Sequence, residues 1–346
     1  MKKGSEPFYD SKSVKPVATY LHPETFETSR PRGDITFIGQ SLPYYDSVRE
    51  RTAAALSEYP SLPAVKADLA DFERVHTKEY LAKLQAMAQD QPIDDPPKRS
   101  AECTGLEYAL PGYCYSLGGM MAAVRLMTEG QLDRAYCFGL PGHHSYPDWG
   151  HGYCLLNPQP AAARYAQEIG FSHPLIVDWD LHHGDGTQAI FNRDDSVHCI
   201  SIHSAVDLYM SMMRVHEAGT TTAARAAGHQ NIPLLSTIFP HEFWEKAGLP
   251  GEYYRYDQAM ARFEAALTQV PWAPDIVFVF SGYDAHAEDC GADTHEWTED
   301  HYRTLTRLVC DFADSCDAPV LSVHGGGYDP DVAVRSAIAH VETLFS

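Results

Sequence analysis

Basic residues and long apolar runs are both scarce in this chain of 346 residues. Its 26 lysines and arginines face 47 aspartates and glutamates, which gives a formal net charge of −21 at pH 7. A field of that sign repels nucleic acid and attracts cations, so we expect no nucleic-acid partner. The longest apolar stretch, in "DIVFVFSG", is far shorter than the roughly 18 residues that suggest a membrane span. No apolar segment follows the N-terminal "MKKGSEPFYDSK", so no secretory signal is visible and we expect a cytoplasmic protein with no membrane partner.

The motifs of several other site classes are missing as well. The eight cysteines contain no C-x-x-C pair, so we expect mostly buried, reduced thiols rather than a disulfide framework. The chain has no G-x-S-x-G nucleophile elbow, which argues against reading its "HGGG" string as an esterase oxyanion loop. That string does not fit G-x-G-x-x-G either, so a dinucleotide site is poorly supported.

Short apolar, β-branched segments alternate with helix-like segments, which favours βαβ units and a mostly parallel sheet. The expected strands are residues 134–139, 174–180, 197–203, 275–281 and 319–324. The expected helices are residues 112–130, 159–170, 256–270 and 301–315. Residues 21–46 and 88–106 are rich in proline, acidic and small residues, so we expect them to be long loops at the rim of a site.

Polar residues typical of active sites follow each expected strand. The strings are "PGHH" (141–144), "DWDLHHGDG" (178–186), "IHS" (202–204), "SGYDAH" (281–286) and "HGGGY" (324–328). In open α/β sheets, sites form at the carboxyl ends of the strands. We therefore expect these five strings to converge on one pocket.

The string "DWDLHHGDG" places several carboxylates where a buried strand ends, and a buried charge needs a partner or a metal. In an extended strand, Asp178, Asp180 and His182 would point to the same side. Asp284 supplies another carboxylate in an equivalent context. Two carboxylates and one imidazole with open positions suit a catalytic zinc, so we predict Asp180, His182 and Asp284 as the ligands of one Zn²⁺ per chain.

The adjacent His143 and His144 suit the proton transfers of such a site, one to take a proton from water and one to give a proton to a departing amine. Asp178 and Asp185 would each orient one imidazole. Three glycines precede Tyr328, and glycine lets backbone approach a ligand closely. We predict that the Tyr328 phenol donates to a developing oxyanion. Which histidine is the base stays open.

Together these strings resemble the histone deacetylase family, including its bacterial acetylpolyamine amidohydrolase relatives, within the arginase/deacetylase fold. "GHGYCLLN", "VDWDLHHGDGTQAIF" and "ISIHS" extend the match, which covers roughly residues 105–330, whereas residues 1–60 match poorly. The resemblance implies a single α/β domain over residues 1–346, built as a three-layer α/β/α arrangement with a mostly parallel central sheet. It also implies zinc-dependent hydrolysis of an N-acetylated amine with release of acetate.

The resemblance assigns further residues. Gly152 matches a glycine whose carbonyl accepts the substrate amide N–H, and Tyr153 matches an aromatic wall of the acyl-lysine tunnel. Tyr209 or Met210 would supply the opposite wall. The family's structural K⁺ site matches Asp178, Asp180, His182, Ser201 and Ile202.

Two positions depart from the family pattern. Pro158 stands where relatives usually have asparagine, which we expect to affect the start of the next helix rather than the chemistry. Gly291 stands where polyamine-specific relatives in animals have glutamate, which weakens a strictly polyamine assignment. Acetyl-lysine in proteins or peptides, an acetylpolyamine and another small acylated amine all stay open as substrates. The acyl-chain preference and the oligomeric state, a homo-oligomer included, are open too.

Two other functions remain as alternatives. An arginase-like ureohydrolase with two manganese ions would need D-x-H-x-D, where this chain has Gly184, and D-x-D, where it has His286. A catalytically silent binding protein for acylated amines would lack a ligand or the tyrosine, yet all of these groups are present.

Overall fold

The computed structural model describes residues 15–34, 38–192, 194–205, 229–235, 246, 253–289 and 296–346. Within these residues, seven strands form one sheet in the order β1-β3-β9-β8-β5-β6-β7, and every neighbouring pair is parallel. The strands are β1 Val17–Tyr20, β3 Arg134–Cys137, β5 Pro174–Asp178, β6 His198–Ser204, β7 His229–Leu234, β8 Ile276–Ser281 and β9 Val320–His324. The mostly parallel α/β arrangement expected from the alternation of segments is confirmed.

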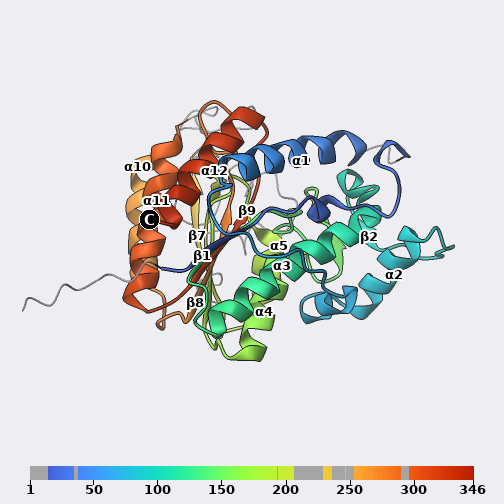
Figure 1. Ribbon diagram of the computed structural model, residues 1–346, viewed down its shortest axis with the longest axis horizontal. Coiled ribbons are helices and arrows are strands. Elements are labelled where there is room, and N and C mark those ends of the chain that lie inside the picture. The colour runs from blue at the N-terminus through green and yellow to red at the C-terminus, as the bar shows by residue number, and fades with distance from the viewer. Residues whose placement is uncertain are drawn as a thin grey trace, which may run out of the picture.

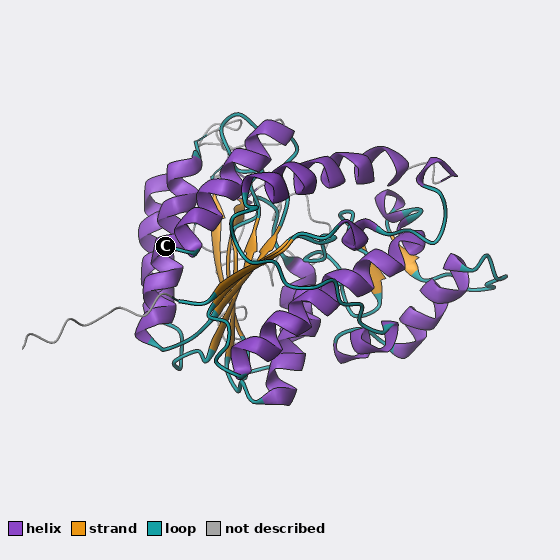
Figure 2. Ribbon diagram, in the orientation of Figure 1, coloured by secondary structure: helices purple, strands orange, loops and turns teal. Residues whose placement is uncertain are grey.

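Helices cover both faces of this sheet, which explains why all residues of β3, β5, β6, β7, β8 and β9 are buried. The helices are α1 Ile38–Ala55, α2 Lys78–Ala88, α3 Leu110–Thr128, α4 Pro158–Ile169, α5 Asp185–Phe191, α10 Tyr256–Thr268, α11 Glu299–Ser315 and α12 Pro330–Leu344. Helices α10, α11 and α12 lie on one side of the sheet and α3 and α4 on the other (Figure 1), so the strands form the middle layer (Figure 2). All six residues of β8 are buried, as expected for a strand covered on both faces.

Local sequence signals explain where several helices begin. Pro158 is the first residue of α4, a position that proline favours because its fixed φ suits a helix and its missing N–H would have no partner there. The expectation that Pro158 affects the start of a helix is thus confirmed. In α11, the buried residues recur at helical spacing, which places one face against the core. They are Tyr302, Leu305, Thr306, Val309 and Ala313.

The structure corrects part of the expected loops and adds elements that the sequence patterns did not indicate. Residues 21–46 are not one long loop, because α1 begins at Ile38 and continues through Pro43. In the second expected loop, residues 98–99 form the short strand β2, which pairs with β4 (Trp149–Gly150). Strands β1 and β7 and helices α1, α2, α5 and α12 are further additions.

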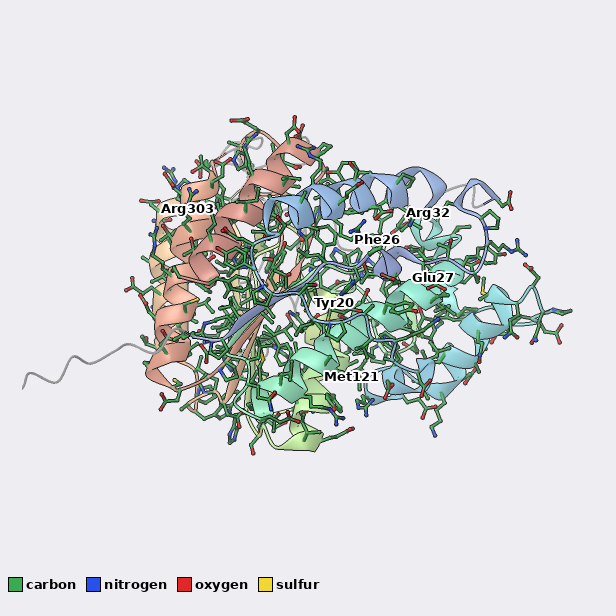
Figure 3. All side chains as sticks on the ribbon, viewed as in Figure 1. Tyr20, Phe26, Glu27, Arg32, Met121 and Arg303 are labelled. Atoms are coloured by element: carbon green, nitrogen blue, oxygen red, sulfur yellow. The ribbon has the colours of Figure 1, made fainter. Side chains whose placement is uncertain are left out.

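The N-terminal strand is bound into the interior by its last residue. Tyr20 is fully buried, and its hydroxyl donates to the carbonyl oxygens of Val65 at 3.1 Å and Tyr115 at 3.0 Å. Phe26, also fully buried, packs on Phe138 with ring centroids 5.9 Å apart. Tyr20 and Phe26 lie in the interior of the molecule, whereas Arg303 lies on its outer side (Figure 3).

Two composition-based expectations can be compared with the described residues. Of the seven cysteines they include, five are buried and all seven are free thiols. No described helix combines the length and the apolar character that crossing a bilayer requires.

Ile276→Ala tests the energetic weight of the central strands. Ile276 is fully buried in β8, so we expect truncation to lower the free energy of unfolding by about 2–5 kcal/mol. Val65→Ala, at a side chain that is 37% exposed, should change it by less than about 0.5 kcal/mol. Urea denaturation of both variants measures the difference, and equal stabilities would contradict the assigned packing.

Candidate functional site

The order of the strands in the sheet brings the site residues together. The five strands that precede the site-type strings, β3, β9, β8, β5 and β6, are consecutive in the sheet. Because all of their pairings are parallel, their carboxyl ends lie along one edge. The expected convergence of the five strings is confirmed.

Asp180, His182 and Asp284 form a compact group at this edge. His182 Nδ1 lies 2.8 Å from Asp284 Oδ2 and 3.3 Å from Asp180 Oδ1. One ligand atom from each residue lies within 4.8 Å of the others. Asp180 is 1% exposed and Asp284 is fully buried, so neither carboxylate is solvated.

Asp180 and His182 do not reach Asp284 through the alternation of side chains along a strand, as the sequence analysis expected. Strand β5 ends at Asp178, so Asp180 and His182 lie in the loop after it and the extended-strand argument does not apply to them. The loop is instead directed by backbone hydrogen bonds: Asp180 N donates to Asp178 Oδ1 at 3.0 Å, and Leu181 N donates to Asp284 Oδ1 at 2.9 Å. These bonds hold the loops of Asp180 and Asp284 next to each other at the carboxyl ends of the paired strands β5 and β8.

The electrostatics of the group suit a divalent cation. Burial, together with the nearby charge of Asp180, raises the pKa of Asp284 to about 7. Two carboxylates held side by side without solvent repel each other unless a cation compensates them. Gly326 N also donates to Asp180 Oδ2 at 2.6 Å, and a Cβ at this glycine would lie 2.8 Å from the same oxygen. Two carboxylate oxygens and one imidazole nitrogen are a set of ligand atoms that could hold one divalent metal ion.

His143 and His144 lie side by side next to this group, with ring centroids 4.1 Å apart and their planes tilted by 49°. His143 Nδ1 lies 3.0 Å from Asp178 Oδ2, and His144 Nδ1 lies 2.8 Å from Asp185 Oδ1. The predicted pairing of each imidazole with its own carboxylate is therefore present in the structure. Burial lowers the pKa of both histidines to about 4, so both rings are neutral near pH 7.

Asp185 has two more side-chain donors that the sequence analysis missed. His151 Nε2 lies 2.9 Å from Asp185 Oδ2, and the Tyr146 hydroxyl donates to the same oxygen at 3.0 Å. His151 also stacks on Trp149, with centroids 4.5 Å apart and an interplanar angle of 15°. The available signal was the density of aromatic and histidine residues in "HSYPDWGHGY", between two recognised motifs.

Gly152 and Tyr153 both adopt positive φ, at 56° and 60°, in a tight turn against His144. A Cβ at Gly152 would lie 2.4 Å from His144 Cδ2, so only glycine allows this approach. Gly152 N donates to Glu102 Oε1 at 3.0 Å, and the Tyr153 side chain is 42% exposed. Tyr153 therefore lies at the accessible side of the site. Tyr209, Met210 and Gly291 lie outside the described residues.

Tyr328 lies half-buried beside His182, with ring centroids 6.1 Å apart. Burial, with the charge of Asp284 adding to it, raises the Tyr328 pKa well above its usual value, so the phenol keeps its proton. Asp289 Oδ2 accepts from the backbone N–H of Tyr328 at 2.7 Å and of Asp329 at 2.9 Å. The Tyr44 hydroxyl of α1 donates to Gly327 O at 2.9 Å. Asp289 and Tyr44 thus position the tyrosine loop, and sequence patterns did not reveal either.

Ser201 and Ile202 lie in β6, next to the metal-site loop. Ser201 pairs in register with Asp178, and its buried Oγ has no hydrogen-bond partner among the residues that the structure describes. Ile202 is 1% exposed. An unpaired buried hydroxyl beside a buried carboxylate suits a cation with oxygen ligands.

The second-metal positions of an arginase-like site look different. His286 Nδ1 accepts from Glu288 N at 3.1 Å, and its Nε2 lies 3.4 Å from Glu299 Oε2. Its Nδ1 is therefore engaged by a residue outside the Asp180–His182–Asp284 group, and its Nε2 faces Glu299. Gly184 offers no side chain for a second ion.

Comparisons with known proteins agree with this geometry. The family model described as the histone deacetylase domain matches residues 43–344. The chain is 30% identical to a histone deacetylase-like amidohydrolase of Pseudomonas aeruginosa, over 79% of this chain and 67% of the relative. It is 28% identical to a probable deacetylase of Archaeoglobus fulgidus, over 84% of this chain and 75% of the relative. A crystal structure of the HDA15 HD domain has the same fold, with a TM-score of 0.71 at 20% identity, covering 96% of this chain and 90% of that one.

Asp284→Asn tests the metal assignment without removing the side chain's shape. The amide oxygen can still accept from Leu181 N, but the charge that favours a divalent cation is lost. We expect Zn²⁺ affinity to fall by more than about 100-fold, because loss of a residue behind a ligand already costs about 10–100-fold. Competition with a chelator measures the affinity. The control is Asp331→Asn, whose side chain is 76% exposed; equal zinc binding by the two variants would refute the assignment.

Proposed function

Because the chain belongs to the histone deacetylase family, we propose that it hydrolyses the amide bond of an N-acetylated amine and releases acetate. The observation that carries the proposal is the meeting of Asp180, His182 and Asp284 with two carboxylate-paired histidines and the half-buried Tyr328. Each chemical task of amide hydrolysis then has a group in reach.

We assign Zn²⁺ as the ion held by Asp180, His182 and Asp284. When bound, it would polarise the substrate carbonyl and lower the pKa of a water molecule toward neutrality. The residues of the chain supply the remaining steps. Asp178, with the unpaired hydroxyl of Ser201 and with Ile202, Asp180 and His182, would hold a structural K⁺.

His143 and His144 are placed to move protons. Each ring is neutral near pH 7 and is held at Nδ1 by a carboxylate, which leaves Nε2 free to accept a proton. One histidine takes the proton of the attacking water, and the pair returns a proton to the departing amine nitrogen. The carboxylates of Asp178 and Asp185 stabilise the imidazolium that forms in between.

Tyr328 stabilises the tetrahedral oxyanion by donating a hydrogen bond from its phenol hydroxyl. Its raised pKa keeps the group protonated, so it acts as a donor throughout the pH range of the reaction. Hydrogen bonds that Asp289 accepts and that Tyr44 donates hold its loop before substrate arrives, which avoids an ordering cost during the reaction.

The substrate enters past Tyr153, whose ring would line one side of the acyl-amine chain. The Gly152 carbonyl would accept the substrate amide N–H and so set its register. The acidic character of the chain favours an amine that carries positive charge, such as an acetylpolyamine or an acetyl-lysine peptide.

Tyr328→Phe tests the oxyanion role. Removing the hydroxyl should lower kcat by about 10²–10³-fold, the usual effect of losing one oxyanion donor, while zinc content stays unchanged. Tyr59→Phe, at a partly buried tyrosine that packs on Phe345, is the matched control and should keep normal turnover. Near-normal kcat for Tyr328→Phe would reject the role.

A substrate screen tests the proposed reaction class. We expect release of acetate from N-acetylputrescine, from acetyl-lysine peptides or from both, with slower hydrolysis of longer acyl chains. Acetate release and zinc content per chain are measured on the same sample. Binding of acetylated amines without turnover at full zinc occupancy would instead favour a silent binding protein, and two manganese ions per chain would favour an arginase-like enzyme.

A further inference from the structure

A second group of metal-ligating side chains lies beside the proposed catalytic centre. His144, His151 and Asp185 each offer a ligand atom within 4.8 Å of the other two. Asp185 uses Oδ1 for His144 Nδ1 and Oδ2 for His151 Nε2, at 2.8 and 2.9 Å. We propose that these three residues form a second binding site for a divalent transition-metal ion such as Zn²⁺, and that occupation of this site inhibits hydrolysis. The inhibition, unlike the binding, rests on the proposed function.

The donor set selects the class of ion. Two imidazole nitrogens and one carboxylate oxygen suit Zn²⁺, Co²⁺ or Cu²⁺, whereas Mg²⁺ and Ca²⁺ prefer oxygen ligands throughout. The Tyr146 hydroxyl, 3.0 Å from Asp185 Oδ2, adds an oxygen at the same place. Three protein ligands leave positions for water, so the site resembles an exchangeable one rather than a closed structural one.

The cluster is both ordered and accessible. The side chains of His144, His151 and Asp185 are 13%, 19% and 12% exposed, in contrast to the sealed Asp180 and Asp284. Stacking on Trp149 fixes the His151 ring, so little side-chain entropy is lost when an ion binds. All three side chains of the second group thus keep some contact with solvent, as His182 of the first group does at 35% exposure.

Charge also favours a cation here. The Asp185 carboxylate lies 2.8 Å from His144 Nδ1 and 2.9 Å from His151 Nε2, so its negative charge is directed at the place where the ion would bind. The Glu102 carboxylate lies behind the same turn, where its Oε1 accepts from Gly152 N. With a chain charge of −21, nothing in the long-range field opposes a divalent ion.

We expect inhibition because metal binding changes which ring nitrogen of His144 carries the proton. In the hydrogen-bonded form, Nδ1 carries the proton and Nε2 is free to accept another. Metal coordination uses the Nδ1 lone pair, so the single ring proton must lie on Nε2. His151 would bind the ion through Nε2, so its single ring proton must lie on Nδ1. Each ring keeps one proton, and two N–H···O bonds are exchanged for two N–metal bonds and one O–metal bond. His144 can then no longer accept a proton.

His151→Gln is the informative variant because it separates the two roles of His151. Glutamine keeps an N–H donor for Asp185 but removes the imidazole nitrogen that would bind the ion. His151→Phe is a second variant that keeps a ring over Trp149. His173→Gln is the matched control, at an exposed histidine that also packs against a tryptophan, Trp272.

Bound zinc is counted first. The full-length protein is dialysed against buffered free Zn²⁺ from about 10 nM to about 100 µM, and metal per chain is measured by mass spectrometry. We expect two zinc ions per chain for the unmodified protein and the His173→Gln control, and one for both His151 variants. A single zinc for the unmodified protein over this range, or a second zinc retained by both His151 variants, would overturn the proposal.

Hydrolysis by each protein is then measured at low and at high zinc. The ratio of the two kcat values is compared between proteins, because this ratio does not depend on basal activity. Filling the second site should lower kcat by about 10²-fold, the typical contribution of a general base, in the unmodified protein and the control but not in the His151 variants. A second zinc that binds without lowering kcat would overturn the inhibitory part. If no protein hydrolyses any substrate even at low zinc, the proposed function fails, while the zinc count still decides the site.

Discussion

The repulsion between two buried carboxylates is the constraint on which the site depends. Asp180 and Asp284 come from loops after different strands and lie together with almost no solvent contact. Such a pair is stable only if a cation, a proton or an array of donors compensates it. The structure supplies backbone donors from Leu181 and Gly326 and the imidazole of His182, and the remaining negative charge makes a divalent ion the natural partner.

The side chains around the two buried carboxylates are also held in place by hydrogen-bonded partners. Each histidine of the pair is held by one carboxylate, and the tyrosine loop is held by Asp289 from one side and by α1 from the other. Nearly every functional side chain thus has its orientation set by a hydrogen bond to a residue from another segment. Preorganisation of this kind suits a hydrolase, because the donors need not reorganise when charge develops. Asp185 goes further, since it serves two imidazoles and a phenol at once.

Sequence patterns predicted the parts of this arrangement that are local. Strands such as β8 are recognisable because burial on both faces makes them continuously apolar, and the polar strings after them mark the strand ends. The ligand trio and the His–Asp pairs followed from residue chemistry at those ends. Helix α1 was missed, and its segment was taken for part of a loop, because Pro43 and a weak apolar pattern obscure it. Asp289 was missed because its role is to accept two backbone N–H groups, which leaves no trace in residue spacing.

The sequence by itself determined which chemistry is available: carboxylates, imidazoles and a glycine-preceded tyrosine at the ends of buried strands, in a chain with a large negative charge. Only the tertiary structure decided which of these groups meet, because the strand order β3-β9-β8-β5-β6 is a property of the folded sheet and not of chain order. It also decided that Asp180 and His182 converge through backbone hydrogen bonds in a loop, and that His151 shares Asp185 with His144. The His151–Asp185 and Gly326–Asp180 contacts join residues that are 34 and 146 positions apart, a separation over which residue periodicity carries no information.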